Sequence, residues 1–368
     1  MTAKKKRVAV LFGGQSGEHE VSLASARAVI DALDPAKYDV LPVGITRAGR
    51  WLAGPGAMPA LLAQADRAKL PAGMQNAELR IEREGKEDQR ETGLATSDFS
   101  MLNSQFLIDV VFPVLHGPMG EDGTVQGLLE LAGVAYVGCG VLASAVGMDK
   151  ALMKAAFAAE GLPLLPWLLL RRAELEGDID AACARVEAQL AYPVFVKPAN
   201  MGSSVGISKA RDRAQLVLGL HEAARYDRRI VVEQGIAARE IEISVLGNDA
   251  PVASVPGEVV PSGEWYDYAA KYIDGQSQIH IPAPISAMLA QQVAELALRA
   301  YAAIDCAGLA RVDFLLDKER NTLYLNEVNT MPGFTSVSMY AKMWQASGLS
   351  YAALLDRLIS LAVERKQP

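Results

Sequence analysis

The sequence predicts an α/β protein that begins with a parallel β-sheet. Val8–Phe12 is a short apolar run followed by Gly13 and Gly14, as expected for a buried strand that ends in a tight turn. An amphipathic segment follows, with apolar residues from Val21 to Leu33, and then a second apolar run, Val40–Ile45. Strand, helix and strand in this order form a β-α-β unit, which joins parallel strands. In such sheets, ligands bind beyond the carboxyl ends of the strands.

Length and composition indicate a globular protein of more than one domain. The chain has 368 residues, of which 51% are hydrophobic and 21% charged, enough for two or three domains with substantial cores. Its formal net charge is -7 and its one basic cluster is Lys4–Arg7, so nucleic acid is not an expected partner. No run approaches the roughly twenty apolar residues of a membrane span, so we expect no membrane segment.

Cysteine usage suggests a reducing compartment. Cys139, Cys183 and Cys306 are far apart, odd in number and outside any paired-cysteine motif. This pattern indicates neither a disulfide framework nor a zinc site. We therefore expect a cytoplasmic protein.

The rest of the chain begins with a polar segment and continues with further strands and helices. Residues 51–101 are polar and rich in Gly and Pro, and we interpret them as an elaborated edge of the first domain. Further strands are expected at 106–115, 191–198, 230–234 and 240–246, and further helices at 125–131, from about 149, at 286–304 and at 351–364.

An acidic hairpin near the C-terminus carries charges where a core would be apolar. Arg311, Asp313, Glu327 and Asn329 stand on two apolar runs joined by the polar segment Asp317–Asn321. If the two carboxylates face each other, the period of two along a strand places all four side chains on one face. Carboxylate and amide oxygens suit Mg²⁺, which usually completes its shell with water and substrate phosphates. The alternative is a solvent-facing hairpin with ordinary surface charges.

Candidates for nucleotide binding lie in the middle of the chain. Lys197 ends a strand and precedes Gly202–Gly206, a loop whose backbone N–H groups could surround phosphate oxygens. The loop lacks the Gly-Lys-Ser/Thr pattern of a phosphate-binding loop, so a plain linker remains the alternative. Lys150 is a second candidate cation. Glu233 and Glu240 could hold ribose hydroxyls or the adenine amino group, or they could be exposed charges.

Candidates for binding a small polar substrate lie in the first domain and in a later loop. Glu18 starts the first helix, where a carboxylate also stabilises the helix dipole. His116 ends a strand and enters a glycine-rich loop, a position typical of both ligand sites and buried core histidines. The loop 257–278 contains four aromatic residues and Lys271. It either packs these aromatics on the core or closes over a site and excludes water from an activated phosphate.

Seven motifs follow one another along nearly the whole chain: Gly13–Ser22, His116–Gly123, Met148–Lys150, Lys197–Gly206, Tyr266–Tyr272, Arg311–Asp313 and Asn326–Gly333. In order and spacing they resemble the D-alanine–D-alanine ligases of the ATP-grasp superfamily. The resemblance implies a three-domain ATP-grasp fold of the α/β (α+β) class with a Rossmann-like N-terminal domain. The implied domains are residues 1–138, a central ATP-grasp subdomain at 139–234 and a C-terminal ATP-grasp domain at 235–368 that includes the flap loop 257–278.

The resemblance also implies a reaction, cofactors and partners. ATP drives the ligation of two D-alanines to D-alanyl-D-alanine for peptidoglycan synthesis. The carboxylate of the first D-alanine attacks the γ-phosphate and forms an acyl phosphate, and the amino group of the second D-alanine displaces phosphate. Two Mg²⁺ or Mn²⁺ ions are the implied cofactors, and a homodimer is the implied assembly.

Site roles are carried over by resemblance, residue by residue. The implied ATP-binding residues are Lys150, Lys197, Glu233, Glu240 and Lys271, and the implied metal ligands are Asp313, Glu327 and Asn329. Those implied to bind or convert the D-alanines are Glu18, His116, Ser203, Tyr272, Arg311, Gly333 and Ser338.

These residues differ in their implied roles toward the two D-alanines. Glu18 pairs with the ammonium of the first D-alanine, close to His116. Ser203 and Tyr272 join Glu18 and hold the flap shut. The guanidinium of Arg311 and the Gly333 backbone stabilise the tetrahedral oxyanion. Ser338 binds the second carboxylate.

The sequence has three alternatives to this function. A related ligase could use D-serine or D-lactate as its second substrate, but Tyr272 resembles a tyrosine that the D-lactate enzymes lack, which favours an amine nucleophile. A dinucleotide oxidoreductase is disfavoured because the glycines lack the full G-x-G-x-x-G pattern and no acidic residue ends the second strand. A non-catalytic ATP-binding regulator is disfavoured by the intact Glu18 and Arg311.

Overall fold

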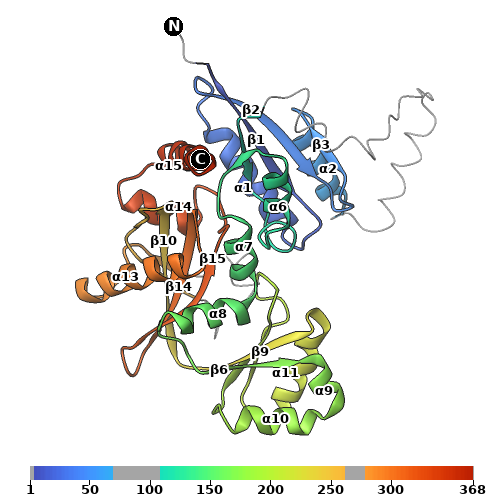
Figure 1. The fold of residues 1–368 in the computed structure, drawn as a ribbon, viewed down its shortest axis with the longest axis vertical. Coiled ribbons are helices and arrows are strands. Elements are labelled where there is room, and N and C mark those ends of the chain that lie inside the picture. The colour runs from blue at the N-terminus through green and yellow to red at the C-terminus, as the bar shows by residue number, and fades with distance from the viewer. Residues whose placement is uncertain (1–3, 69–107, 262–277, 368) are drawn as a thin grey trace, which may run out of the picture.

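The structure is a computed structural model that describes residues 4–68, 108–261 and 278–367. Its described residues form three sheets, one above another in Figure 1, with helices packed on each. The N-terminal sheet is mostly parallel, and the other two are antiparallel. The α/β fold class expected from the sequence is therefore confirmed.

The N-terminal sheet has the strand order β3-β2-β1-β4-β5. β1, β2, β4 and β5 pair in parallel and β3 pairs antiparallel at the edge, as many parallel sheets do. The strands are β1 (Lys6–Gly13), β2 (Tyr38–Ile45), β3 (Trp51–Ala53), β4 (Val110–Pro113) and β5 (Ala135–Tyr136). The helices are α1 (His19–Ala32), α2 (Ala57–Ala68) and α6 (Thr124–Leu131).

The turn after β1 requires glycine. Gly13 has a φ of +90°, and a Cβ there would lie 2.2 Å from the Ile45 carbonyl oxygen. The backbone therefore passes directly over the end of β2 and enters α1. Gly13 N–H also donates to the Ser22 hydroxyl at 2.8 Å, which fixes the start of the helix. The first β-α-β unit expected from the sequence is confirmed.

The central sheet has the order β6-β9-β7-β8. Its apolar face packs on three helices, and fully buried Val196, Leu220 and Ile230 lie in this core. The strands are β6 (Trp167–Arg171), β7 (Val194–Pro198), β8 (Ser208–Ala210) and β9 (Arg229–Gln234). The helices are α9 (Arg172–Gly177), α10 (Ile179–Glu187) and α11 (Arg213–Tyr226).

The C-terminal sheet has the order β13-β12-β10-β14-β15, and β11 also pairs with β10. One face packs on α13, which starts at a Ser286 N-cap whose hydroxyl accepts from Leu289 N–H. The strands are β10 (Ala238–Gly247), β11 (Val252–Ala253), β12 (Gly257–Val260), β13 (Gln278–His280), β14 (Gly308–Asp317) and β15 (Leu323–Asn329). The helices of this part are α7 (Val141–Met148), α8 (Lys150–Ala159), α13 (Ala287–Ala303), α14 (Met339–Ala346) and α15 (Tyr351–Lys366).

β12 and β13 flank the segment expected to form a flap. They pair with each other, with Val259 opposite Ile279. Residues 257–260 and 278 of the expected loop are thus strand residues. Pro261 follows β12, and residues 262–277 lie outside the described residues.

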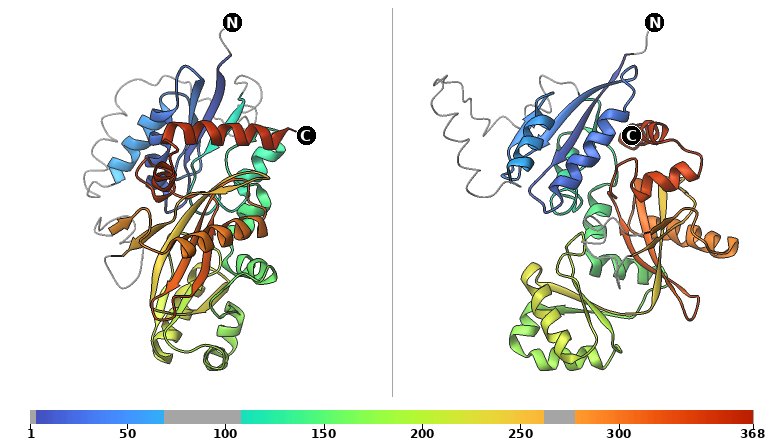
Figure 2. Two further views of the ribbon diagram at one scale, coloured as in Figure 1. Left: turned by 90° about the vertical axis from the view of Figure 1, so that its left-hand side faces the viewer. Right: turned by 180° about the vertical axis from the view of Figure 1, so that it is seen from behind.

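α15 returns from the C-terminal sheet to the N-terminal one, as both views in Figure 2 show. Its Asp356 accepts from Lys37 at 2.6 Å and from the Tyr38 hydroxyl at 2.8 Å. Its Arg365 guanidinium lies 4.3 Å from the centre of the Tyr136 ring. Apolar residues of α15 share one core with β1 and β4, so the first and last parts of the chain form a continuous packed unit.

Within the described segments, no single helix has the length and apolar character to cross a membrane. The pair α14 and α15 meets these criteria only jointly, by length and composition, and bends by 105° between its two helices.

Candidate active site

A cavity of about 880 Å³ is lined by residues from all three parts of the protein, each built on one of the three sheets. It is lined from the N-terminal part by α1 and the loop after β4, and from the other parts by the start of α8, the loop before β8, and β10, β14 and β15. Many of the predicted site residues line it: Glu18, His116, Lys150, Ser203, Arg311, Glu327, Asn329, Gly333 and Ser338.

The acidic hairpin forms one wall of this cavity. In β14 and β15, Asp313 lies opposite Glu327 and Arg311 lies opposite Asn329, the pairing that the sequence pattern predicts. Asn329 Nδ2 donates to Asp313 Oδ2 at 2.8 Å. A β-bulge between Asp313 and Phe314 follows this face. Bulges twist a strand locally and often occur beside active sites.

Arg311 is held by carboxylates on two strands. Its Nε and Nη2 donate to the two oxygens of Asp313 at 2.7 and 2.6 Å. Its Nε also lies 3.2 Å from Glu242 Oε2, on the adjacent strand β10. Burial alone would lower the pKa of Arg311, but the charges of Asp313 and Glu242 outweigh it and raise that pKa well above its usual value. Arg311 is therefore a permanent cation in the cavity wall.

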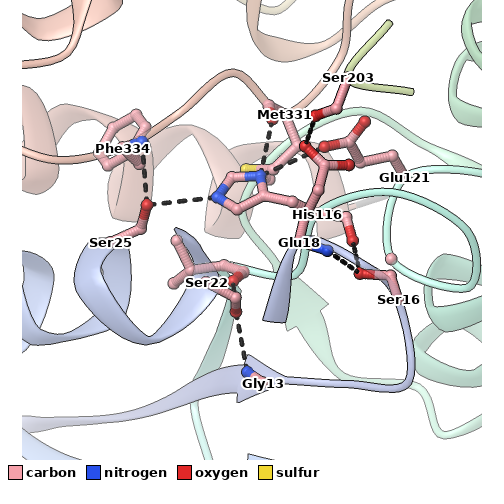
Figure 3. Close-up of polar contacts among 12 residues, drawn as sticks. Gly13, Ser16, Glu18, Ser22, Ser25, His116, Glu121, Ser203, Met331 and Phe334 are labelled. Atoms are coloured by element: carbon pink, nitrogen blue, oxygen red, sulfur yellow. Dashed lines mark hydrogen bonds and ion pairs between the residues drawn. The ribbon is translucent and has the colours of Figure 1, made fainter. Parts of the chain in front are cut away.

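Glu18 lines the same cavity from the start of α1 (Figure 3). The Ser203 hydroxyl donates to Glu18 Oε1, across 185 residues of sequence. Ser203 has a left-handed φ of 49°, uncommon for a residue with a side chain. The Ser16 hydroxyl accepts from Glu18 N–H at 3.2 Å and donates to the His116 carbonyl at 2.6 Å. Glu18 is thus held through its carboxylate by Ser203 and through its backbone N–H by Ser16.

His116 lies buried behind Glu18, also in Figure 3. Its Nδ1 is 3.2 Å from both Glu121 Oε1 and the Met331 carbonyl oxygen. Its Nε2 is 3.2 Å from the Ser25 hydroxyl, which in turn accepts from Phe334 N–H at 3.3 Å. The imidazole therefore connects the N-terminal part of the site to the segment after β15.

Burial and charge act oppositely on this histidine. Burial lowers the pKa of His116. The hydrogen bond and the negative charge of Glu121 together have a larger, opposite effect, so the pKa of His116 lies above its usual value. Burial also raises the pKa of the Glu121 carboxyl. Both side chains of this pair line the cavity.

Lys150 opens α8 with its side chain toward the loop before β8. Its Nζ donates to the Met201 carbonyl at 2.6 Å, and its backbone N–H donates to the Ala199 carbonyl at 2.9 Å. Asp149 caps α8 by accepting from Ala151 and Leu152 N–H, and it also pairs with Arg229 of β9. The first turn of α8 is thereby attached to the central sheet.

Lys197 and Glu233 do not line this cavity. They lie on β7 and β9, where Phe195 rather than Lys197 is opposite Glu233 in register. Lys197 Nζ is 2.6 Å from Glu233 Oε2. Burial would raise the pKa of Glu233, but the charges of Lys154 and Lys197 lower it to about 2. Burial lowers the pKa of Lys197, but the charges of Glu233, Glu327 and Glu240 outweigh it, so that pKa is raised.

Gly333 and Ser338 lie together at the start of α14. A Cβ on Gly333 would be 3.4 Å from Ser338 Oγ. That hydroxyl accepts from Thr335 N–H at 3.0 Å and lies 2.8 Å from Thr335 Oγ1. Ser338 is the N-cap of α14, and a helix N-terminus favours anions. Lys271 and Tyr272 lie outside the described residues.

Comparison with known proteins supports one family. Residues 7–139 match the family model for the D-ala D-ala ligase N-terminus, and residues 156–360 match that for the D-ala D-ala ligase C-terminus. The chain belongs to the D-alanine–D-alanine ligase family. The family expected from the seven motifs is therefore confirmed.

Two relatives in the same family match nearly the full length of this chain. The D-alanine–D-alanine ligase of Heliobacterium modesticaldum is 52% identical over 361 residues, which cover 98% of this chain and 95% of the relative. That of Ruminiclostridium cellulolyticum is 50% identical over 372 residues, with 98% and 96% covered.

Solved structures of the ligase family have the same fold. The VanG D-Ala:D-Ser ligase from Enterococcus faecalis is 35% identical with a TM-score of 0.80, and 98% of this chain and 100% of that chain are covered. The D-alanine–D-alanine ligase from Coxiella burnetii is 36% identical with a TM-score of 0.78, and 99% and 96% are covered.

The acidic face suits the divalent cation expected for a D-alanine–D-alanine ligase. Asp313 and Glu327 offer carboxylate oxygens and Asn329 offers an amide oxygen, all hard ligands. Mg²⁺ is typically bound by one or two carboxylates together with substrate phosphates. In residues 4–68, 108–261 and 278–367, no cluster of three or more His, Cys, Asp or Glu side chains is arranged as a metal site. The donor set that the protein provides is two carboxylates and one amide, which fits Mg²⁺ or Mn²⁺.

Three residues of this ligase-family site were not predicted from the sequence. Glu121 lies inside the quoted motif His116–Gly123, so its position five residues after the histidine was the available signal. Lys154, one helical turn after Lys150, pairs with Glu233. Glu242 is two residues after Glu240 on β10, so their side chains point to the same face of the sheet. This is the face of the acidic hairpin, because Glu242 lies opposite Asp313. Each looks like a surface charge in the sequence, whereas long-range packing buries Lys154 and Glu242 and partly buries Glu121.

Proposed function

We propose that this protein ligates two D-alanines to D-alanyl-D-alanine with ATP, through a D-alanyl phosphate, and releases ADP and phosphate. The observation that carries this proposal is the meeting of Glu18, Arg311 and the acidic hairpin face in one cavity. A carboxylate for an ammonium, a guanidinium for an oxyanion and a metal-binding face for phosphates are the groups this chemistry needs. The product would serve peptidoglycan synthesis.

ATP would lie between the central and C-terminal sheets. Asp313, Glu327 and Asn329 would hold two Mg²⁺ or Mn²⁺ ions, which when bound would neutralise phosphate charge. Lys150 would bind phosphate oxygens and Lys197 would lie on the phosphate or adenine side. Glu233 and Glu240 would contact adenosine, and Lys271 would approach the γ-phosphate from the flap. The proposed domains remain 1–138, 139–234 and 235–368.

The first D-alanine would be oriented by Glu18. Its ammonium would pair with the carboxylate that Ser203 already holds, and His116 would lie beside it. Its carboxylate would then be directed at the γ-phosphate in the same cavity. Fixed orientation of the two reacting groups lowers the entropic part of the barrier.

The second D-alanine would be bound at the start of α14. Ser338 and the helix N-terminus would hold its carboxylate. The amino group must lose its proton before it attacks the acyl phosphate. Arg311 and the Gly333 N–H would stabilise the oxyanion that forms. Closure of the flap, with Tyr272 joining Ser203 and Glu18, would protect the acyl phosphate from water.

The direct test is phosphate release from ATP and Mg²⁺, with the products identified by mass spectrometry. We expect release with D-alanine, with formation of the dipeptide, and none with L-alanine or without an amino acid. Release that does not depend on D-alanine would reject the proposal.

The second substrate is the one point on which another candidate is supported. The similarity to a D-Ala:D-Ser ligase structure makes D-serine the alternative acceptor, and D-lactate is the other one considered. Mixtures of D-alanine with each acceptor, with products identified by mass, separate the candidates. A pH series further separates D-lactate, because the ammonium groups of D-alanine and D-serine must lose a proton before they attack, whereas D-lactate has no amino group. We also expect Tyr272→Phe to shift activity toward D-lactate, and an unchanged preference would count against the proposed latch.

We further propose that the protein is a cytoplasmic homodimer. Sedimentation velocity of the purified chain tests the assembly, and a single species at the monomer mass would reject it. Fractionation of cells that express the chain tests its location.

A further inference from the structure

Glu242 is a buried carboxylate of the cavity wall to which none of the proposed steps gives a role. It lies on β10 directly opposite Asp313 of β14, which in turn lies opposite Glu327 of β15. Three carboxylates thus form one row across three adjacent strands. The Glu242 side chain is 5% exposed and that of its neighbour Arg311 is 18% exposed.

Arg311 divides its contacts between two members of this row. Asp313 receives both the Nε and the Nη2 hydrogen bonds, while Glu242 Oε2 lies 3.2 Å from Nε. Asn329 also donates to Asp313. Three N–H groups therefore occupy most of the acceptor capacity of the Asp313 carboxylate.

The three hydrogen bonds that Asp313 accepts compete with the binding of a metal ion by the same carboxylate. A carboxylate that binds a dication must give up part of its hydrogen bonding, and the dication repels the neighbouring guanidinium. A buried guanidinium without a carboxylate is strongly unfavourable. Arg311 therefore needs a second counter-charge that is not itself a metal ligand, and Glu242 is in contact with it.

We propose that Glu242 is a positioning residue. It would hold the Nε of Arg311 in place when the Asp313 carboxylate binds the metal ion instead of the guanidinium. Glu242 anchors one edge of the guanidinium, and the Nη groups remain available to donate to an oxyanion near Gly333. Without Glu242, Arg311 and the metal ion compete for Asp313. The inference rests on the proposed role of Asp313 as a metal ligand.

The chain contains a matched control for the loss of a buried carboxylate in this sheet. Glu258 of β12 accepts from Arg239 Nε and Nη2 at 2.6 and 2.8 Å. It lies opposite Ile241, the neighbour of Glu242, so it is on the other face of the sheet. Glu258→Gln removes an ion pair of the same kind without touching the cavity.

The experiment measures Mn²⁺ binding in the presence of ADP, with free Mn²⁺ detected by electron paramagnetic resonance, so that no turnover is needed. It compares the unchanged protein, Glu242→Gln, Arg311→Met, the double variant and the Glu258→Gln control. We expect Glu242→Gln to weaken Mn²⁺ binding about tenfold when Arg311 is present and less than about threefold in the Arg311→Met background. Glu258→Gln should leave Mn²⁺ binding unchanged. If Arg311→Met does not fold, Arg311→Gln takes its place.

Equal weakening in both backgrounds would mean that Glu242 acts only by its charge, and would overturn the positioning role. No weakening in either would do the same. The variant Asp313→Asn distinguishes failure of the positioning role of Glu242 from failure of the proposed function. If Asp313→Asn binds Mn²⁺ normally, the metal role of Asp313 and the positioning role of Glu242 are both wrong. If Asp313→Asn loses Mn²⁺ while Glu242→Gln shows no coupling to Arg311, the inference alone fails.

Discussion

Lys197 Nζ lies 2.6 Å from one carboxylate oxygen of Glu233, and Lys154 Nζ forms an ion pair with the other oxygen. The three side chains come from β7, β9 and α8, and Lys154 and Glu233 are buried. One carboxylate thus joins the central sheet to the helix that starts at Lys150. This cluster explains how a proposed adenosine contact is held in a fixed position.

Lys154→Met is expected to destabilise the protein by about 3 kcal/mol, because it removes one partner of a buried ion pair. With Glu233 less constrained, KM for ATP should rise more than kcat falls. Urea unfolding and steady-state kinetics measure both effects. Lys318→Met, at an exposed lysine, is the control and should change neither. Normal stability of Lys154→Met would contradict the structural role of the pair.

The Glu233 carboxylate should make stability depend on pH below about 5. Its pKa is lowered to about 2 in the folded protein, from an ordinary value of 4.5, so its contribution is present above 4.5 and is lost as pH falls toward 2. The difference in unfolding free energy between the unchanged protein and Glu233→Gln should therefore narrow by about 1 kcal/mol between pH 6 and pH 4. Urea unfolding at both pH values measures it, and a constant difference would reject the shift.

Glu121→Gln should lower the pKa of His116, because the hydrogen bond and charge of Glu121 raise it. The histidine resonances in an NMR titration, assigned with His116→Gln, report this directly. We also expect a reduced kcat/KM for D-alanine. Glu130→Gln is the matched control, since Glu130 accepts from the Tyr136 hydroxyl at 2.7 Å and does not line the cavity. The same His116 pKa in Glu121→Gln would show that the pair is not coupled.

Asp313→Asn and Glu327→Gln should each reduce turnover by at least about 100-fold while the fold is retained, because each removes a negative oxygen donor from the proposed metal face. Circular dichroism and phosphate release measure the two properties. Chelation of metal ions should abolish activity of the unchanged protein, and added Mg²⁺ or Mn²⁺ should restore it. Near-normal activity of either variant would remove the argument from the acidic face.

Elements with strong local signals are predictable from the sequence alone. The apolar run and glycines after it predict β1 and its turn, and the alternation around Asp313 and Glu327 predicts their pairing in β14 and β15. These features depend on residues close in sequence, where side-chain period and turn chemistry decide the conformation. α7 was missed because its almost wholly apolar segment, Val141–Met148, carries no clear helical period.

Tertiary structure decided which charges are buried and which side chains meet. Ser203 reaches Glu18 across 185 residues, and Lys154 reaches Glu233 across 79. Glu242 faces Arg311 only because β10 pairs with β14 in one register. A lone charged residue has the same local signature whether it is solvated or buried, since its environment is set by segments distant in the chain. Sequence therefore predicted the fold and most of the candidate site, and packing alone assigned the partners that hold it.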